Sequence, residues 1–148
     1  MSIESEVAAI NAENTAKIYE GISQLQDSSH GNMLKAGWWM DLESGTDLIG
    51  EVRDGTRLGK ALVAEKLCLT HSEISEAMEG HRKGLMDDHL TYRKMVEVEL
   101  ADAYLRIADL AGALELDLAG AVVEKMAYNA QREDHKVETR KLDDGKQY

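Results

Sequence analysis

The sequence predicts an all-α protein with four helices, and three observations support this fold class. The chain contains no proline and no phenylalanine, and runs of β-branched or aromatic residues are few. Alanine, leucine, glutamate, methionine and lysine, which favour helices, are common. Apolar residues recur at the three- and four-residue spacing that places them along one helical face. The 148 residues suffice for one domain with a core, so we expect a single domain over residues 1–148.

The first helix is expected at about residues 2–27. Ser2 suits the N-cap position, and Glu4 places an acidic side chain in the first turn, where the helix dipole favours negative charge. The polar residues at 11–14 (NAEN) interrupt the apolar stripe of this helix. We therefore expect part of the helix to pack only in an oligomer.

A long loop is expected at residues 28–56, because this stretch carries five glycines and has no regular periodicity. Loops of this length inside a small domain are usually functional or partly disordered. The loop also carries the adjacent residues Trp38 and Trp39. These either close one end of the core or form a stacking surface that binds the base of a ligand, and the sequence leaves both interpretations open.

Three further helices are expected, at about residues 57–81, 92–114 and 118–135. Gly80 and Gly84 provide stop signals for the first of these helices, and Asp117 suits the N-cap of the last. The polar stretch at residues 136–148 is expected to be a mobile tail.

The composition also limits the partners and the compartment. A formal net charge of −11 repels nucleic acid and anionic membranes, so we expect neither as a partner. Cys68 is the single cysteine, which rules out an internal disulfide and indicates a reducing compartment. The sequence shows neither a signal-peptide pattern nor an apolar run of membrane length. We therefore expect a cytoplasmic protein.

The second predicted helix directs two acids toward the face that should be packed. With Glu73 set at zero and about 100° per residue, Ile74 lies at about 100° and Leu69 at about 320° around the helix axis. Apolar residues therefore flank Glu73 on both sides, and Glu76 lies at their edge, at roughly 300°. Glu79 falls on the opposite, solvated face.

The third predicted helix repeats this arrangement. With Glu99 set at zero, Ala103 lies at about 40°, Leu100 at about 100° and Met95 at about 320°. Asp102 falls at the edge of this apolar arc, at roughly 300°. Each of the two helices thus carries one acid inside its apolar arc and a second acid at the margin.

Packing the two arcs together would bring four carboxylates close to one another. Two such charges about 5 Å apart repel by roughly 3 kcal/mol at an effective dielectric constant near 20. A divalent cation would compensate, and an all-carboxylate set suits Mg²⁺, Mn²⁺ or Ca²⁺. No histidine follows a glutamate at the spacing of a di-iron bundle, and no Cys/His cluster suits zinc. A single Glu-x-x-Glu usually marks a solvated helix face, but two acid pairs inside apolar arcs favour a metal site.

These motifs resemble those of the MazG-like, all-α nucleoside triphosphate pyrophosphohydrolases. The acid pattern is Glu73-x-x-Glu76 followed, after the intervening stretch 77–98, by Glu99-x-x-Asp102, within KLCLTHSEISEAMEGHRKG and VEVELADAYLRIADLAG. The segment EKMAYNAQREDH resembles the family's third motif, Lys-x3-Asn-x2-Arg, and the ending GKQY resembles its Gly-Lys-Lys-aromatic end except at Gln147. The likeness covers roughly residues 57–148, with a motif core at 57–135.

The resemblance implies a four-helix-bundle-type domain that assembles as a homodimer or homotetramer. It also implies hydrolysis of a (d)NTP between the α and β phosphates, giving a monophosphate and pyrophosphate. Mg²⁺ is the implied cofactor, and Mn²⁺ is a possible substitute. The preferred nucleotide does not follow from the sequence.

The resemblance assigns roles to individual residues. Glu73, Glu76, Glu99 and Asp102 are the implied metal ligands, and Glu76 or Glu73 is the implied catalytic carboxylate. The implied substrate-binding residues are Lys125, Asn129 and Arg132, which are expected to share one helical face and to bind phosphate. Trp38 and Trp39 join this substrate-binding set as the base-stacking hypothesis.

Other interpretations remain open at this point. The chain is alternatively a non-catalytic helical oligomeric interaction protein, or the same fold acting on another nucleotide-like substrate. Arg106 is expected to pair with Asp102, four residues before it. Asp87, Asp88 and His89 are expected to cap the third helix or to lie in solvent.

Overall fold

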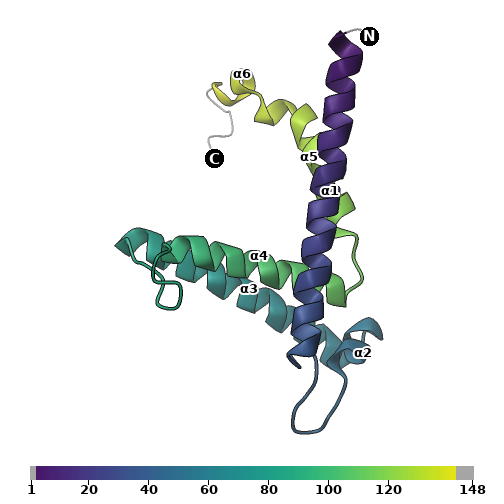
Figure 1. The fold of residues 1–148 in the computed structure, drawn as a ribbon, viewed down its shortest axis with the longest axis vertical. Coiled ribbons are helices and arrows are strands. Elements are labelled where there is room, and N and C mark those ends of the chain that lie inside the picture. Colours follow the sequence, from purple (N-terminus) through teal and green to yellow (C-terminus); the bar gives the residue numbers. More distant parts are fainter. Residues whose placement is uncertain (1–2, 143–148) are drawn as a thin grey trace. The chain divides into compact units, whose positions relative to one another are not determined.

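The computed structural model describes residues 3–142, and the regular secondary structure of this range consists of helices joined by loops, without β-strands (Figure 1). The predicted all-α class is therefore confirmed for the described range. The N-cap at Ser2 and the GKQY ending lie outside the described residues. No helix within residues 3–142 is both long enough and apolar enough to span a membrane.

The chain divides into two compact units, which are described separately. One unit is Gln24–Leu116, and the other combines the residues up to Ser23 with those from Asp117 onward. The helix α1, Ile3–Lys35, contributes to both units. The division leaves the single-domain interpretation as a prediction.

The Gln24–Leu116 unit is built on a hairpin of two antiparallel helices. These are α3 (Arg57–Lys83) and α4 (Met95–Ala113), which lie side by side in Figure 1. The short helix α2 (Leu48–Arg53) packs against α3 near the open end of the hairpin. The core at this end consists of Trp39, Ile49, Val52, Leu110 and Ala113.

The ends of α3 follow from local chemistry. Thr56 is the N-cap, and its hydroxyl accepts a hydrogen bond from the Gly59 amide. Gly84 ends the helix in the left-handed conformation with φ of 64°, as predicted. Gly80, the other predicted stop signal, lies inside the helix and is buried. A Cβ atom at Gly80 would approach the Met95 side chain to 2.8 Å, so this glycine permits close packing of α3 on α4.

The expectation of one long loop at residues 28–56 is wrong. Residues 28–35 belong to α1, and α2 occupies residues 48–53. The end of α1 is held by α4, because the Ser29 hydroxyl donates to the Leu105 carbonyl at 2.9 Å and His30 pairs with Asp109. These contacts outweigh the helix cost of Gly31, roughly 1 kcal/mol.

The other unit contains α5, Leu118–Gln131, which begins at the predicted N-cap. The Asp117 carboxylate accepts a hydrogen bond from the Gly120 amide at 2.8 Å. The helix ends earlier than expected, at Gln131, and a 3₁₀ turn follows at Glu133–His135. Within the expected tail, Val137–Arg140 forms the short helix α6. The mobility of the tail stays a prediction.

Candidate metal centre and adjoining pocket

Glu73 on α3 and Glu99 on α4 are both buried, with 7% and 8% of their surfaces exposed. Glu76, one turn after Glu73, is exposed. One carboxylate oxygen from each of these three residues lies within 4.8 Å of the other two. The predicted orientations of the two inner acids are confirmed, and their role as metal ligands stays a prediction.

The clustered acids change one another's proton affinity. The pKa of Glu99 rises to about 7, first because burial removes water from the carboxylate, then because of its hydrogen bond with Glu73. The negative charges of Glu76, Glu73 and Asp102 add to this rise. Burial and the charge of Glu73 also raise the pKa of Asp102, against the opposing effect of Arg106. The cluster therefore carries more negative charge than its surroundings neutralise.

The donor set fits a hard divalent cation. Three carboxylates, two of them buried, offer only oxygen ligands, which suits Mg²⁺, Mn²⁺ or Ca²⁺ rather than zinc. Asp102 lines the same hollow, which has a volume of about 680 Å³. The fourth predicted ligand thus lies beside the three clustered carboxylates.

The far wall of this hollow is the loop between α3 and α4. Asp87 is 6% exposed, and its carboxylate accepts hydrogen bonds from the backbone amides of His89 and Leu90. The expectation that these residues cap the third helix or lie in solvent is therefore wrong for Asp87 and is confirmed for Asp88 and His89, which are exposed. The N-cap of α4 is Lys94, without a side-chain hydrogen bond. The hydrogen bonds of the Asp87 carboxylate therefore stabilise the turn that forms this wall.

Arg106 does not form its predicted ion pair with Asp102. Its Nε donates to the Glu73 carboxylate at 2.6 Å, which joins α4 to α3. The reason is geometric, because Arg106 lies near the packed face of α4 and Glu73 projects from the facing helix toward it. Through this ion pair, Arg106 neutralises part of the negative charge of the carboxylate cluster.

A second hollow, of about 340 Å³, adjoins the acids and is mainly apolar. Both tryptophans line it, but they differ in burial: Trp38 is 66% exposed and Trp39 is 3% exposed. Trp39 therefore belongs to the core, and Trp38 presents its ring to solvent. This hollow adjoins the acidic hollow, since Asp102 lines both.

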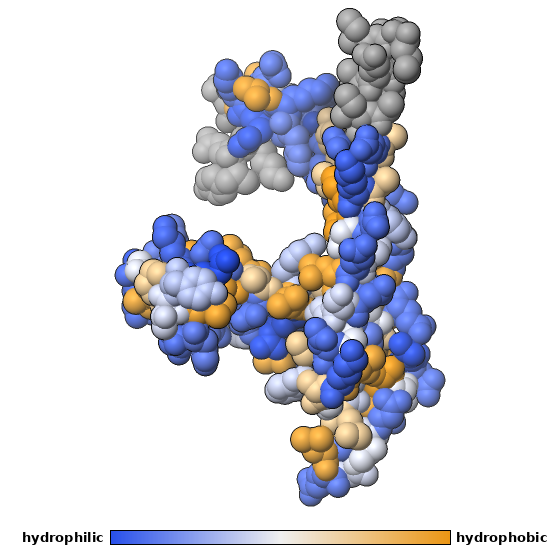
Figure 2. Space-filling model, in the orientation of Figure 1, coloured by the Kyte–Doolittle hydropathy of each residue, from blue (hydrophilic) through white to orange (hydrophobic). Residues whose placement is uncertain are grey.

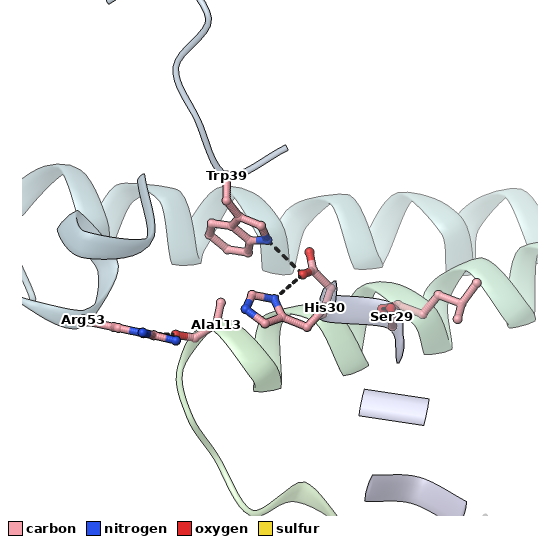
Figure 3. Close-up of polar contacts among 7 residues, drawn as sticks. Ser29, His30, Trp39, Arg53 and Ala113 are labelled. Atoms are coloured by element: carbon pink, nitrogen blue, oxygen red, sulfur yellow. Dashed lines mark hydrogen bonds and ion pairs between the residues drawn. The ribbon is translucent and has the colours of Figure 1, made fainter. Parts of the chain in front are cut away.

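The buried carboxylate of Asp109 holds Trp39 in position. The Trp39 Nε1 donates to Asp109 Oδ1 at 2.8 Å, and His30 Nδ1 lies 2.8 Å from the same oxygen (Figure 3). The Lys66 ammonium lies 4.5 Å from the centre of the Trp39 ring. Neither Asp109 nor His30 is predicted as a pocket residue from the sequence. The only signal was an acid inside the apolar run of residues 107–114, and nothing marked the histidine.

The three residues of the third motif belong to the other unit. Lys125 on α5 lies with its ammonium 4.6 Å from the centre of the Tyr128 ring. Arg132 lies beyond the end of α5, in extended conformation, so the expectation that it shares a helical face with Lys125 is wrong. Its guanidinium makes two hydrogen bonds to Asp134, which raise its pKa. The Asn129 side-chain oxygen is buried and has no partner among the described residues.

In comparisons with known proteins, the chain matches no family model, no curated protein and no solved structure. The resemblance of its motifs to the MazG-like enzymes therefore stays a prediction.

Proposed function

We propose that the protein is a Mg²⁺-dependent nucleoside triphosphate pyrophosphohydrolase that cleaves the bond between the α and β phosphates. One observation carries the proposal: a cluster of three carboxylates, two of them buried, lies in a hollow that adjoins the aromatic pocket, the hollow lined by Trp38 and Trp39. Asp102 lines both hollows. A metal centre beside a pocket of this chemistry suits a ligand with a charged phosphate chain and a flat ring. The acid motifs of the sequence support the same reaction.

Glu73, Glu76 and Glu99, with Asp102 beside them, would hold Mg²⁺ or its substitute Mn²⁺. When bound, the ion supplies charge that offsets the negative charge developing on the phosphate oxygens. Glu76 is the carboxylate best placed to accept a proton from the attacking water, because it lines the hollow and is exposed. Glu73 is already held by Arg106 and acts as a ligand in this proposal.

The second hollow would bind the nucleoside. Its volume of about 340 Å³ falls within the range of small-molecule pockets. The exposed ring of Trp38 is available for stacking on a base, and the buried ring of Trp39 forms a fixed wall. The phosphate-binding roles of Lys125, Asn129 and Arg132 stay a prediction from the third motif of the sequence.

We also propose that two copies of the chain associate through the α3–α4 hairpin. Large apolar side chains lie exposed on both helices, and Figure 2 shows apolar patches on this hairpin. They lie at about 80–140° from Glu73 or Glu99, whereas Glu76 and Asp102 lie at roughly 300°. Because the helices are antiparallel, these side chains share the side of the hairpin that faces away from the exposed acids. They are Leu67, Ile74, Met78, Leu100, Tyr104 and Ile107.

The same apolar side favours the alternative function, a helical interaction protein without catalysis. The two functions differ in their response to divalent ions, because only the enzyme requires Mg²⁺ at the carboxylates. An interaction protein would keep its association state and its thermal stability when Mg²⁺ is added.

A panel of the eight standard ribo- and deoxyribonucleoside triphosphates tests the proposal. With Mg²⁺, at least one should yield a monophosphate and pyrophosphate, identified by chromatography. The activity should disappear with EDTA and in Glu76→Gln, but persist in the control Glu79→Gln. Glu79 lies on the same helix, pairs with Lys83 and is not part of the carboxylate cluster. Release of orthophosphate alone, or no cleavage with Mg²⁺ or Mn²⁺, would contradict the proposal.

A further inference from the structure

Arg106 lies at the boundary between the carboxylate cluster and the aromatic pocket. Its Nε donates a hydrogen bond to Glu73, which lines the acidic hollow, while Arg106 itself lines the aromatic pocket. Its side chain is 41% exposed. The guanidinium is therefore held by an acid of the acidic hollow and remains accessible from the aromatic pocket.

The two terminal nitrogens of Arg106 make no hydrogen bond within the part of the chain that the structure describes. A guanidinium held through Nε keeps its outer donors in a fixed plane, so it is preorganised for a second oxyanion. The ion pair with Glu73 also fixes the position of the side chain. Asp102, which faces both hollows, supplies no hydrogen-bond partner for these donors.

We propose that Arg106 binds the phosphate attached to the nucleoside, through the terminal nitrogens that Glu73 leaves free. The inference rests on the proposed function. A nucleotide with its base beside Trp38 and its outer phosphates at the carboxylates must pass the boundary between the two hollows. The phosphate that crosses it is the α phosphate. Two cations line the pocket, Lys66 beside the Trp39 ring and Arg106, and Arg106 is the one that pairs with an acid of the other hollow, Glu73.

The experiment compares nucleosides with their 5′-monophosphates by isothermal titration calorimetry in the presence of Mg²⁺. The dissociation constant of the nucleoside divided by that of its monophosphate measures how much the phosphate contributes to binding. In Arg106→Gln this ratio should fall by roughly tenfold or more, because a charge-assisted pair of hydrogen bonds is lost. Arg106→Lys keeps the charge but loses the paired donors of the guanidinium. Its ratio should lie between that of the wild type and that of Arg106→Gln. Arg57→Gln, an exposed arginine that lines neither hollow, is the matched control.

A structural role for Arg106 gives a different pattern. If Arg106→Gln weakens nucleoside and monophosphate binding equally, or leaves the ratio unchanged, the inference is overturned. A wild-type protein that binds both equally overturns it as well. Mn²⁺ binding without nucleotide is the control for the carboxylates. It should not weaken in Arg106→Gln, because Arg106 no longer competes with the ion for Glu73. A clear loss of Mn²⁺ binding would show that the carboxylate cluster itself is disrupted and would count against the inference.

The two proposals fail separately. If the wild-type protein cleaves a triphosphate but Arg106→Gln keeps the wild-type ratio, the function stands and the role of Arg106 does not. If the ratio falls in Arg106→Gln but no triphosphate is cleaved, Arg106 is a phosphate ligand of a nucleotide-binding protein and the hydrolase proposal is rejected.

Discussion

The Trp39 indole nitrogen donates a hydrogen bond to the Asp109 carboxylate across 2.8 Å, although 70 positions separate the two residues. The same oxygen pairs with His30, so one buried acid on α4 ties two residues of the N-terminal segment to the hairpin (Figure 3). Asp109 thereby fixes the inner wall of the aromatic pocket. The geometry of this pocket therefore depends on a carboxylate that lies outside the Glu73, Glu76 and Glu99 cluster.

Asp109→Ala should destabilise the protein by about 2–4 kcal/mol, because it leaves the buried Trp39 indole and the partly buried His30 imidazole without their acceptor. Asp109→Asn retains an acceptor oxygen and should lose less. Urea unfolding, followed by circular dichroism, measures both changes. The control is Asp88→Ala, whose side chain is 88% exposed. Equal stability of Asp109→Ala and Asp88→Ala would contradict the buried network.

The inward acids were predictable because helical periodicity is a local property. Glu73 and Glu99 stand out from their own neighbours in sequence, and no knowledge of the partner helix is needed to place them. The N-cap at Asp117 follows in the same way from the adjacent residues. The sequence predicts such features well, since each depends on contacts within a few positions.

The remaining features depend on distant contacts that a single sequence does not display. The last part of α1 is helical because Ser29 and His30 reach residues 76 and 79 positions away. Gly80 continues α3 because Met95 packs against it, although a glycine near a helix end usually suggests a stop. Arg106 takes Glu73 as its partner across two helices, where sequence spacing pointed to a residue on its own helix.

The stability of the metal-free protein should fall as the pH rises from about 4.5 to 7. The pKa of Glu99 is raised to about 7 from an ordinary value of 4.5, so the folded state holds this proton more tightly than the unfolded state. The resulting stability is complete below about pH 4.5 and is lost as the pH passes through 7. In Glu99→Gln the corresponding loss, on the order of 2 kcal/mol, should be absent.

Denaturant unfolding in EDTA at pH 5 and pH 8 measures this difference for the wild-type protein and Glu99→Gln. Glu97→Gln is the control, because Glu97 lies on the same helix with a side chain that is 55% exposed. The control should follow the wild-type pH dependence. If Glu99→Gln does so too, Glu99 is not the group that takes up the proton.

Gly59→Ala should destabilise the Gln24–Leu116 unit by at least about 2 kcal/mol, because overpacking here meets backbone rather than a flexible side chain. A Cβ atom at this position would lie 2.0 Å from the Glu51 carbonyl oxygen, so α2 would have to move away from α3. The control is Gly31→Ala, where nothing lies within 4 Å of the added atom. That substitution should stabilise α1 by up to about 1 kcal/mol. Thermal unfolding that ranks the two variants in the opposite order would contradict the packing of α2 on α3.

Ile74→Glu should convert an associated protein to monomers, if the apolar side of the hairpin is the surface between copies. Ile74 is 49% exposed and lies among other exposed apolar residues of α3 and α4, so a charge there would be buried without a partner on association. The control is Ser75→Glu, one position along α3 and outside the apolar side. Sedimentation velocity should show a single larger species for the wild type and the control. An unchanged sedimentation coefficient in Ile74→Glu would place the interface elsewhere, and a monomeric wild type would remove the case for self-association through this hairpin.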